Sequence, residues 1–110
     1  MSTSSLFNLF SELPDSLEDE EFRELCRCRN LTIERIVSPP STRSDLMIQE
    51  QDEWILVLQG QALLTLDGEK QPLSQGDSLF IPAGSPHRVL DTSSDPLCIW
   101  LAVHLYPDDR

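Results

Sequence analysis

The spacing of glycine-containing turns is the feature that most limits how this chain can fold. From Leu31 onward, short apolar runs alternate with turn dipeptides at intervals of roughly 8 to 12 residues. Each dipeptide supplies a glycine where a tight reversal needs positive φ, and Asp67-Gly68 has the composition preferred by a two-residue hairpin. The dipeptides are Gln59-Gly60, Asp67-Gly68, Gln75-Gly76 and Ala83-Gly84. Because no helix of ordinary length fits between them, the sequence predicts an all-β fold.

Short strands are expected between these turns, in the number typical of a jelly roll. A sheet with this many apolar residues must fold over and pack on itself, because an open single layer cannot bury both of its faces. We expect strands at 31–37, 45–49, 53–58, 61–66, 71–73, 78–81, 87–90 and 97–106. The sequence therefore predicts one β-barrel domain over residues 31–110.

Residues 1–30 are expected to form an N-terminal extension that packs on the barrel or on a dimer partner. Ser16 could cap a short helix. However, arginines alternate with other side chains over residues 22–29, and this alternation favours a strand. Arg29-Asn30 would then turn this strand back as a hairpin.

Two of the predicted strands, 54–58 and 97–103, are apolar on both faces, whereas a strand with one wet face should alternate. Their outer faces therefore need a cover, which is either the N-terminal hairpin or a second copy of the protein. Small barrels with large apolar patches commonly pair through them, so we expect a homodimer.

The charge balance limits the partners of this protein. It has 19 acidic and 8 basic residues, a formal net charge of −11, which repels nucleic-acid phosphates and anionic membranes. Cys26, Cys28 and Cys98 are an odd count without zinc-like spacing, which favours reduced thiols. The N-terminus lacks the pattern of a signal peptide, and no run approaches the roughly 20 apolar residues of a membrane helix. We expect a cytoplasmic protein with neither nucleic acid nor membrane as a partner.

The most specific motif runs from Gly76 to His87: a glycine, five residues, Pro-x-Gly, two residues and a histidine. Gly76 opens a turn, residues 78–81 form a strand, and Pro82 to Gly84 reverse the chain so that His87 begins the next strand pointing inward. Upstream, Glu53 is followed by six residues and Gly60.

These two segments resemble the second motif of cupins and the end of the first. The resemblance covers about residues 45 to 91 and implies a double-stranded β-helix, the jelly-roll barrel of cupins, with Glu53 and His87 inside it. It makes an enzyme or a ligand-binding barrel plausible by analogy with the fold.

The resemblance also implies a divalent metal, which cupins with a full site hold with two histidines, the glutamate and the second-motif histidine. Here Met47 and Gln49 stand at the first two positions, or Leu46 and Ile48 with the alternative spacing. We therefore expect a weakened site of Gln49, Glu53 and His87 for iron, manganese, nickel or zinc, since an amide oxygen is a poor substitute for imidazole.

The remaining candidates would line a pocket around Glu53, a potential general base, and His87, an acid or a ligand. The pocket-lining candidates are Met47, Gln49, Ile55, Asp91 and His104. His104 is either a further ligand or a polar residue at the barrel rim, and Asp91 either caps a strand end or lines the pocket mouth. Alternatively, Glu53 and His87 form a buried hydrogen-bonded pair without chemistry.

Three functions follow from these observations. The first is a barrel that binds a small molecule, with or without a weak metal. The second is a metal-free isomerase or epimerase in which Glu53 and His87 move protons. The third is a structural or regulatory dimer without catalysis.

Overall fold

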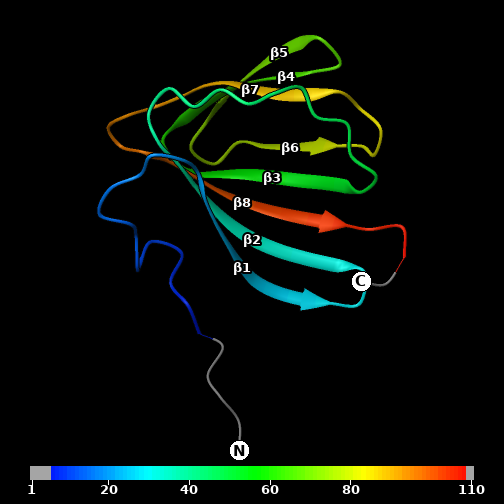
Figure 1. The fold of residues 1–110 in the computed structure, drawn as a ribbon, viewed down its shortest axis with the longest axis horizontal. Helices are drawn as coiled ribbons and strands as arrows, with labels where there is room; N and C mark the ends of the chain where they lie inside the picture. The colour runs from blue at the N-terminus through cyan, green and yellow to red at the C-terminus, as the bar shows by residue number, and fades with distance from the viewer. Residues whose placement is uncertain (1–5, 109–110) are drawn as a thin grey trace, which may run out of the picture.

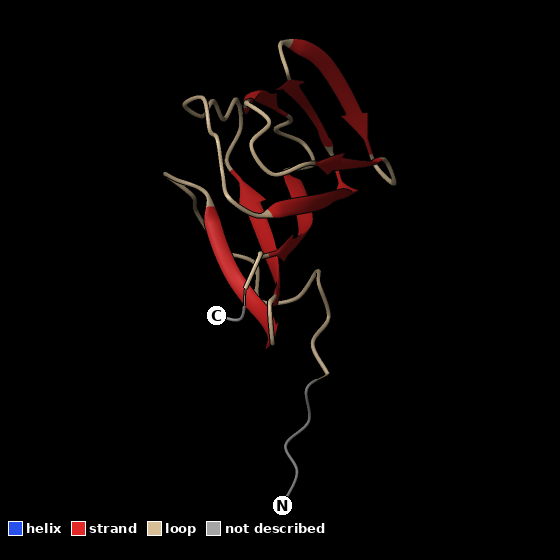
Figure 2. Cartoon of the chain, turned by 90° about the vertical axis from the view of Figure 1, so that its right-hand side faces the viewer, coloured by secondary structure: helices blue, strands red, loops and turns tan. Residues whose placement is uncertain are grey.

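The computed structural model describes residues 6–108 and contains eight β-strands and no helix in that range (Figures 1 and 2). The strands are β1 (Glu21–Cys28), β2 (Leu31–Ser38), β3 (Asp52–Gln59), β4 (Gln61–Leu66), β5 (Glu69–Ser74), β6 (Ser78–Ile81), β7 (His87–Thr92) and β8 (Cys98–Leu105). The described residues therefore also contain no helix that is long and apolar enough to cross a membrane.

The strands form two antiparallel sheets that face each other. One sheet has the order β1-β2-β8-β3-β6 and the other has the order β5-β4-β7. The buried core lies between them, because it joins Ile55 and Trp100 of the larger sheet to Leu64 and Leu73 of the smaller one. The predicted all-β jelly-roll fold is confirmed.

The extension before Leu31 contains the predicted strand. β1 pairs with β2 along its whole length, and Arg29 turns the hairpin with a φ of 53°. β1 is thus the edge strand of the larger sheet (Figure 1).

The strand predicted at 45–49 is wrong. Only Met47 bridges to the neighbouring β7, through two backbone hydrogen bonds with His87 of 2.8 and 3.0 Å. Leu46 and Ile48 are 59% and 67% exposed, so the apolar pattern that favoured a strand does not correspond to a buried face.

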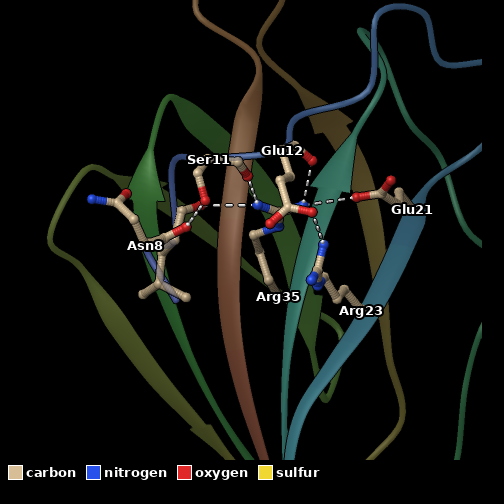
Figure 3. A network of polar contacts seen from close by, with 7 residues as sticks. Asn8, Ser11, Glu12, Glu21, Arg23 and Arg35 are labelled. Carbon is tan, nitrogen blue, oxygen red and sulfur yellow. Dashed lines mark hydrogen bonds and ion pairs between the residues drawn. The ribbon is translucent and has the colours of Figure 1, made fainter. Parts of the chain in front are cut away.

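The face of the larger sheet that is turned away from the core carries a buried arginine. Arg35 of β2 is fully buried and donates hydrogen bonds to the backbone oxygens of Leu9 (3.2 Å), Ser11 (2.5 Å) and Glu12 (3.2 Å). It also donates to Glu21 Oε1 at 3.0 Å, as Figure 3 shows. Through Arg35, the segment before β1 is held against the outer face of the sheet.

Candidate functional site

A cavity of about 180 Å³ lies between the two sheets and receives side chains from both. Its apolar wall comes from core residues, and its polar part comes from β2, β3, β7, β8 and the loop before β3. The apolar wall includes Ile55, Leu64, Ile81, Val89 and Trp100, and the polar part includes Glu34, Gln49, Glu53, His87 and His104. Of the residues predicted from the sequence, Met47, Gln49, Glu53, Ile55, His87 and His104 all line this cavity.

Glu53 lies on β3 and is 8% exposed. The side-chain amide of Gln49 donates a hydrogen bond of 2.8 Å to its Oε1. This bond satisfies one oxygen of a carboxylate that would be costly to bury alone. Gln49 therefore acts in the site as a hydrogen-bond donor to Glu53.

His87 opens β7 directly after the reversal at Pro82 to Gly84 and is 3% exposed. Its Nδ1 lies 3.0 Å from the backbone oxygen of Ser85. Because a carbonyl oxygen only accepts, Nδ1 carries a hydrogen and donates it to Ser85. The hydrogen bonds of Glu53 and His87 thus go to Gln49 and Ser85, which gives no support to a hydrogen-bonded pair between the two.

His104 points into the barrel from β8. In the sheet register it stands directly opposite Glu53 of β3, and its Nε2 lies 3.9 Å from Glu53 Oε2. The same nitrogen lies 2.8 Å from Oε2 of Glu34 on β2, on the other side of β8. Gln51 contacts the remaining ring nitrogen at 3.2 Å.

The surroundings of His104 favour its charged form. Burial acts to lower the pKa of this imidazole, but the hydrogen bond with Glu34 and the charges of Glu53 and Glu34 act in the opposite direction and prevail. The pKa of His104 therefore lies above its ordinary value. An imidazole whose protonated form is favoured by two carboxylates is a candidate proton donor at the wall of the cavity.

Glu34 was missed by the sequence reasoning, together with Glu20 and Trp100 as cavity residues. A signal for Glu34 was present, because it shares one face of β2 with Ile36, and a carboxylate on a face turned to the core needs a partner. Asp91 does not join the site: it is exposed, and its Oδ1 accepts a hydrogen bond of 3.0 Å from the backbone of Thr92.

The cysteines lie outside this chemistry. All three are free, and Cys26 and Cys28 are exposed on β1. Burial, with a smaller effect of Glu20, raises the pKa of Cys98 to about 12, so this residue stays a thiol at neutral pH.

The side chains do not fit the four-ligand metal site that the sequence resemblance implies. Met47 and Gln49 stand where two imidazoles are needed, and the Gln49 amide nitrogen faces the carboxylate of Glu53. Within residues 6–108, no group of three or more His, Cys, Asp or Glu side chains could hold a metal ion. Imidazole and carboxylate donors are what iron and manganese sites require. We therefore assign no metal-dependent step to this cavity.

Comparison with known proteins agrees with this fold. The sequence profile of the cupin domain family matches residues 35–104, so the chain belongs to the cupin domain family. The particular members that resemble it include a protein of Ralstonia eutropha JMP134 described as a candidate mannose-6-phosphate isomerase. That protein is 35% identical, with a TM-score of 0.84 over 92% of this chain and 97% of the other.

Other similarities are more distant or shorter. A Streptococcus pyogenes protein of unknown function has the same fold at 20% identity, with a TM-score of 0.81 over 98% of this chain and 92% of the other. An uncharacterised protein of Methanocaldococcus jannaschii is 38% identical over 48 residues, 44% of this chain and 38% of that protein. Quercetin 2,3-dioxygenase of Bacillus subtilis is 54% identical over 39 residues, 36% of this chain and 12% of the enzyme. The matches to these two curated relatives thus span well under half of either protein.

Proposed function

We propose that this cupin binds a small molecule in the cavity between its sheets, without a metal ion. The observation that carries the proposal is the cavity itself, in which the side chains of Glu53 and His87, 8% and 3% exposed, meet an apolar wall that includes Trp100. Polar groups that converge on an apolar cavity are typical of a small-molecule site.

The size of the cavity limits the ligand. Since an apolar cavity of about 150 Å³ accommodates benzene, a cavity of about 180 Å³ suits a molecule with the bulk of one six-membered ring. Small-molecule sites commonly combine an apolar wall with a few convergent polar groups, as this one does.

Binding can be tested with benzyl alcohol, a neutral probe of this size, by ligand-observed NMR. We expect the wild type to bind it and Val89→Phe to lose binding, because Val89 lines the cavity and a phenyl ring would fill it. Leu90→Phe is the matched control, since Leu90 lines a surface depression away from the cavity. The proposal would be overturned if the wild type did not bind benzyl alcohol, or if Val89→Phe bound it as well as the wild type.

The absence of a metal requirement is tested separately. In protein purified without chelators or a His tag, we expect iron, manganese, nickel and zinc together below about a tenth of an equivalent. A stoichiometric metal that is lost in Glu53→Gln would contradict a metal-free site.

A second candidate function is proton transfer, as in an isomerase or epimerase. The observation that favours it is that three side chains able to exchange protons, Glu53, His87 and His104, line one cavity. The resemblance to a candidate mannose-6-phosphate isomerase adds support. However, the cavity lining includes no lysine or arginine, so a phosphorylated sugar lacks the cationic partners it needs.

This second function predicts exchange of carbon-bound hydrogen. In D₂O, dihydroxyacetone should gain deuterium next to its carbonyl in the presence of the wild type, and His87→Gln should abolish the gain. Exchange no faster than in buffer with dihydroxyacetone, glyceraldehyde and other unphosphorylated carbonyl compounds of this size would remove the candidate.

A further inference from the structure

We infer that the barrel selects a small organic cation carrying N–H donors, such as an ammonium group on a ring-sized apolar body, over neutral and anionic molecules of the same shape. The inference rests on the proposed binding function and specifies its ligand class. Three independent observations point to it.

The first observation is the hydrogen-bonding character of the polar groups. Nδ1 of His87 donates to Ser85, so this hydrogen is not available to a ligand. Glu53 is an acceptor with one oxygen occupied by Gln49, and the hydrogen on Nε2 of His104 is engaged by Glu34. The polar part of the cavity therefore offers acceptors, and a ligand must bring donors. An ammonium group brings three donors and no acceptor.

The second observation is the charge of the lining. Three carboxylates line the cavity, those of Glu20, Glu34 and Glu53, and the lining contains no lysine or arginine. Ser38 donates a hydrogen bond of 2.6 Å to Glu20, and no basic side chain neutralises this carboxylate within the lining. In a poorly solvated cavity such an excess of negative charge attracts a cation and repels an anion.

The third observation is the depression beside the cavity, which shares Glu20, Phe22 and Ser44 with it. It adds two further carboxylates, Glu18 and Asp19, and only Arg43 opposes them. The Arg43 guanidinium donates to the backbone oxygen of Leu90. An acidic surface next to a cavity raises the local concentration of cations.

The apolar wall defines the rest of the ligand. Trp100 is 3% exposed, its Nε1 donates to Ser38 at 2.9 Å, and its ring lines the cavity beside Ile55 and Leu64. An aromatic and aliphatic wall of this kind packs against an apolar body and holds it out of water. The expected ligand thus has an ammonium group at one end and an apolar ring or branched chain at the other.

The test compares benzylamine, benzyl alcohol and benzoate, which share a ring and differ in charge, by calorimetry at pH 7. We expect benzylamine to bind about tenfold more tightly than benzyl alcohol, a difference of about 1.4 kcal/mol, and benzoate to bind most weakly. Added salt should reduce the advantage of benzylamine, since screening acts on charges and leaves benzyl alcohol unaffected.

Glu53→Gln should remove most of that advantage, measured as the ratio of the benzylamine and benzyl alcohol affinities within the same variant. Glu34→Gln, checked for folding by circular dichroism, provides a second variant in case Glu53→Gln fails to fold. Glu24→Gln is the matched control, because Glu24 lies exposed on β1 in an ion pair with Arg27.

The outcomes separate the two proposals. If benzyl alcohol binds as tightly as benzylamine, or benzoate binds best, the cation inference is overturned and the binding function stands. If the wild type binds none of the three probes, the binding function fails and the cation inference fails with it.

Discussion

Nε2 of His104 lies 2.8 Å from Oε2 of Glu34, and this contact joins the inner faces of β8 and β2. The two residues form a diagonal pair, since Thr32 stands opposite His104 and Ala102 stands opposite Glu34. Both side chains are mostly buried, at 12% and 22% exposure. The contact therefore links the stability of the larger sheet to the protonation of one histidine.

This link predicts a pH dependence with a definite sign. Because the folded-state pKa of His104 is raised above 6.5, its contribution to stability is fully present below about pH 6.5 and is lost as the pH rises through the folded value. The free energy of unfolding in urea should fall over that range. Glu34→Gln should cost about 1.5 kcal/mol at pH 6 and flatten the dependence.

The pKa of each histidine can be measured separately. The chain has two histidines, so ring-proton NMR resolves both titrations, and Glu34→Gln should lower the pKa of His104. Glu24→Gln should leave that pKa unchanged. A wild-type stability that stays flat from pH 6 to 9 would contradict the linkage.

Gly60 and Gly68 offer a matched comparison. Both have positive φ, 84° and 81°, so alanine is strained at either site. A Cβ on Gly60 would meet Ser93 Oγ at 2.6 Å and the Leu97 backbone oxygen at 2.9 Å, whereas a Cβ on Gly68 would meet nothing within 4 Å. We expect Gly68→Ala to cost about 1 kcal/mol and Gly60→Ala at least about 2 kcal/mol more. Equal losses in urea denaturation would refute the steric explanation.

Arg35 holds the segment before β1 in place. Arg35→Ala leaves the backbone oxygens of Leu9, Ser11 and Glu12 without their donor, and should destabilise the fold by about 3 kcal/mol. Limited proteolysis should then cut the chain before β1 faster than in the wild type. Arg27→Ala is the control, because its ion pair with Glu24 is about half exposed and contributes less than about 1 kcal/mol. Similar losses for the two variants would rule out this role of Arg35.

The outer face of the larger sheet predicts a homodimer. Phe80 of β6 is 49% exposed and stands opposite Trp54 of β3, with Leu101 and Val103 of β8 on the same face. We propose that two copies pair through this apolar face. Sedimentation at micromolar concentration should give a dimer, and Phe80→Glu should give a monomer. Leu46→Glu places the same charge on a similarly exposed loop residue and should leave the dimer intact. A monomeric wild type would exclude the pairing.

Local patterns in the sequence were sufficient to predict much of the fold and several residues of the cavity. Asp67-Gly68 predicted the hairpin of β4 and β5, and the spacing around Gly76 and Pro82 placed His87 at the start of β7 with its side chain in the cavity. Glu53, Gln49 and Ile55 were predicted as neighbours and line one cavity with His87.

The contact that the sequence did not predict depends on which strands become neighbours. Glu34 and His104 are 70 positions apart, and their contact exists because β8 lies between β2 and β3. No short-range pattern specifies that order. The strand expected at 45–49 was predicted from a local apolar pattern. That prediction was wrong because no surface of the protein buries Leu46 and Ile48.

The position of β8 between β2 and β3 also determines when the site can exist during synthesis. Glu34 and Glu53 are synthesised early. The strand that lies between their strands, β8, is the last of the eight to be made. Such non-local pairing is slow to form. A nascent chain that has not reached Leu105 lacks β8 and therefore part of the polar lining of the cavity. Ligand binding should begin only after β8 has been translated.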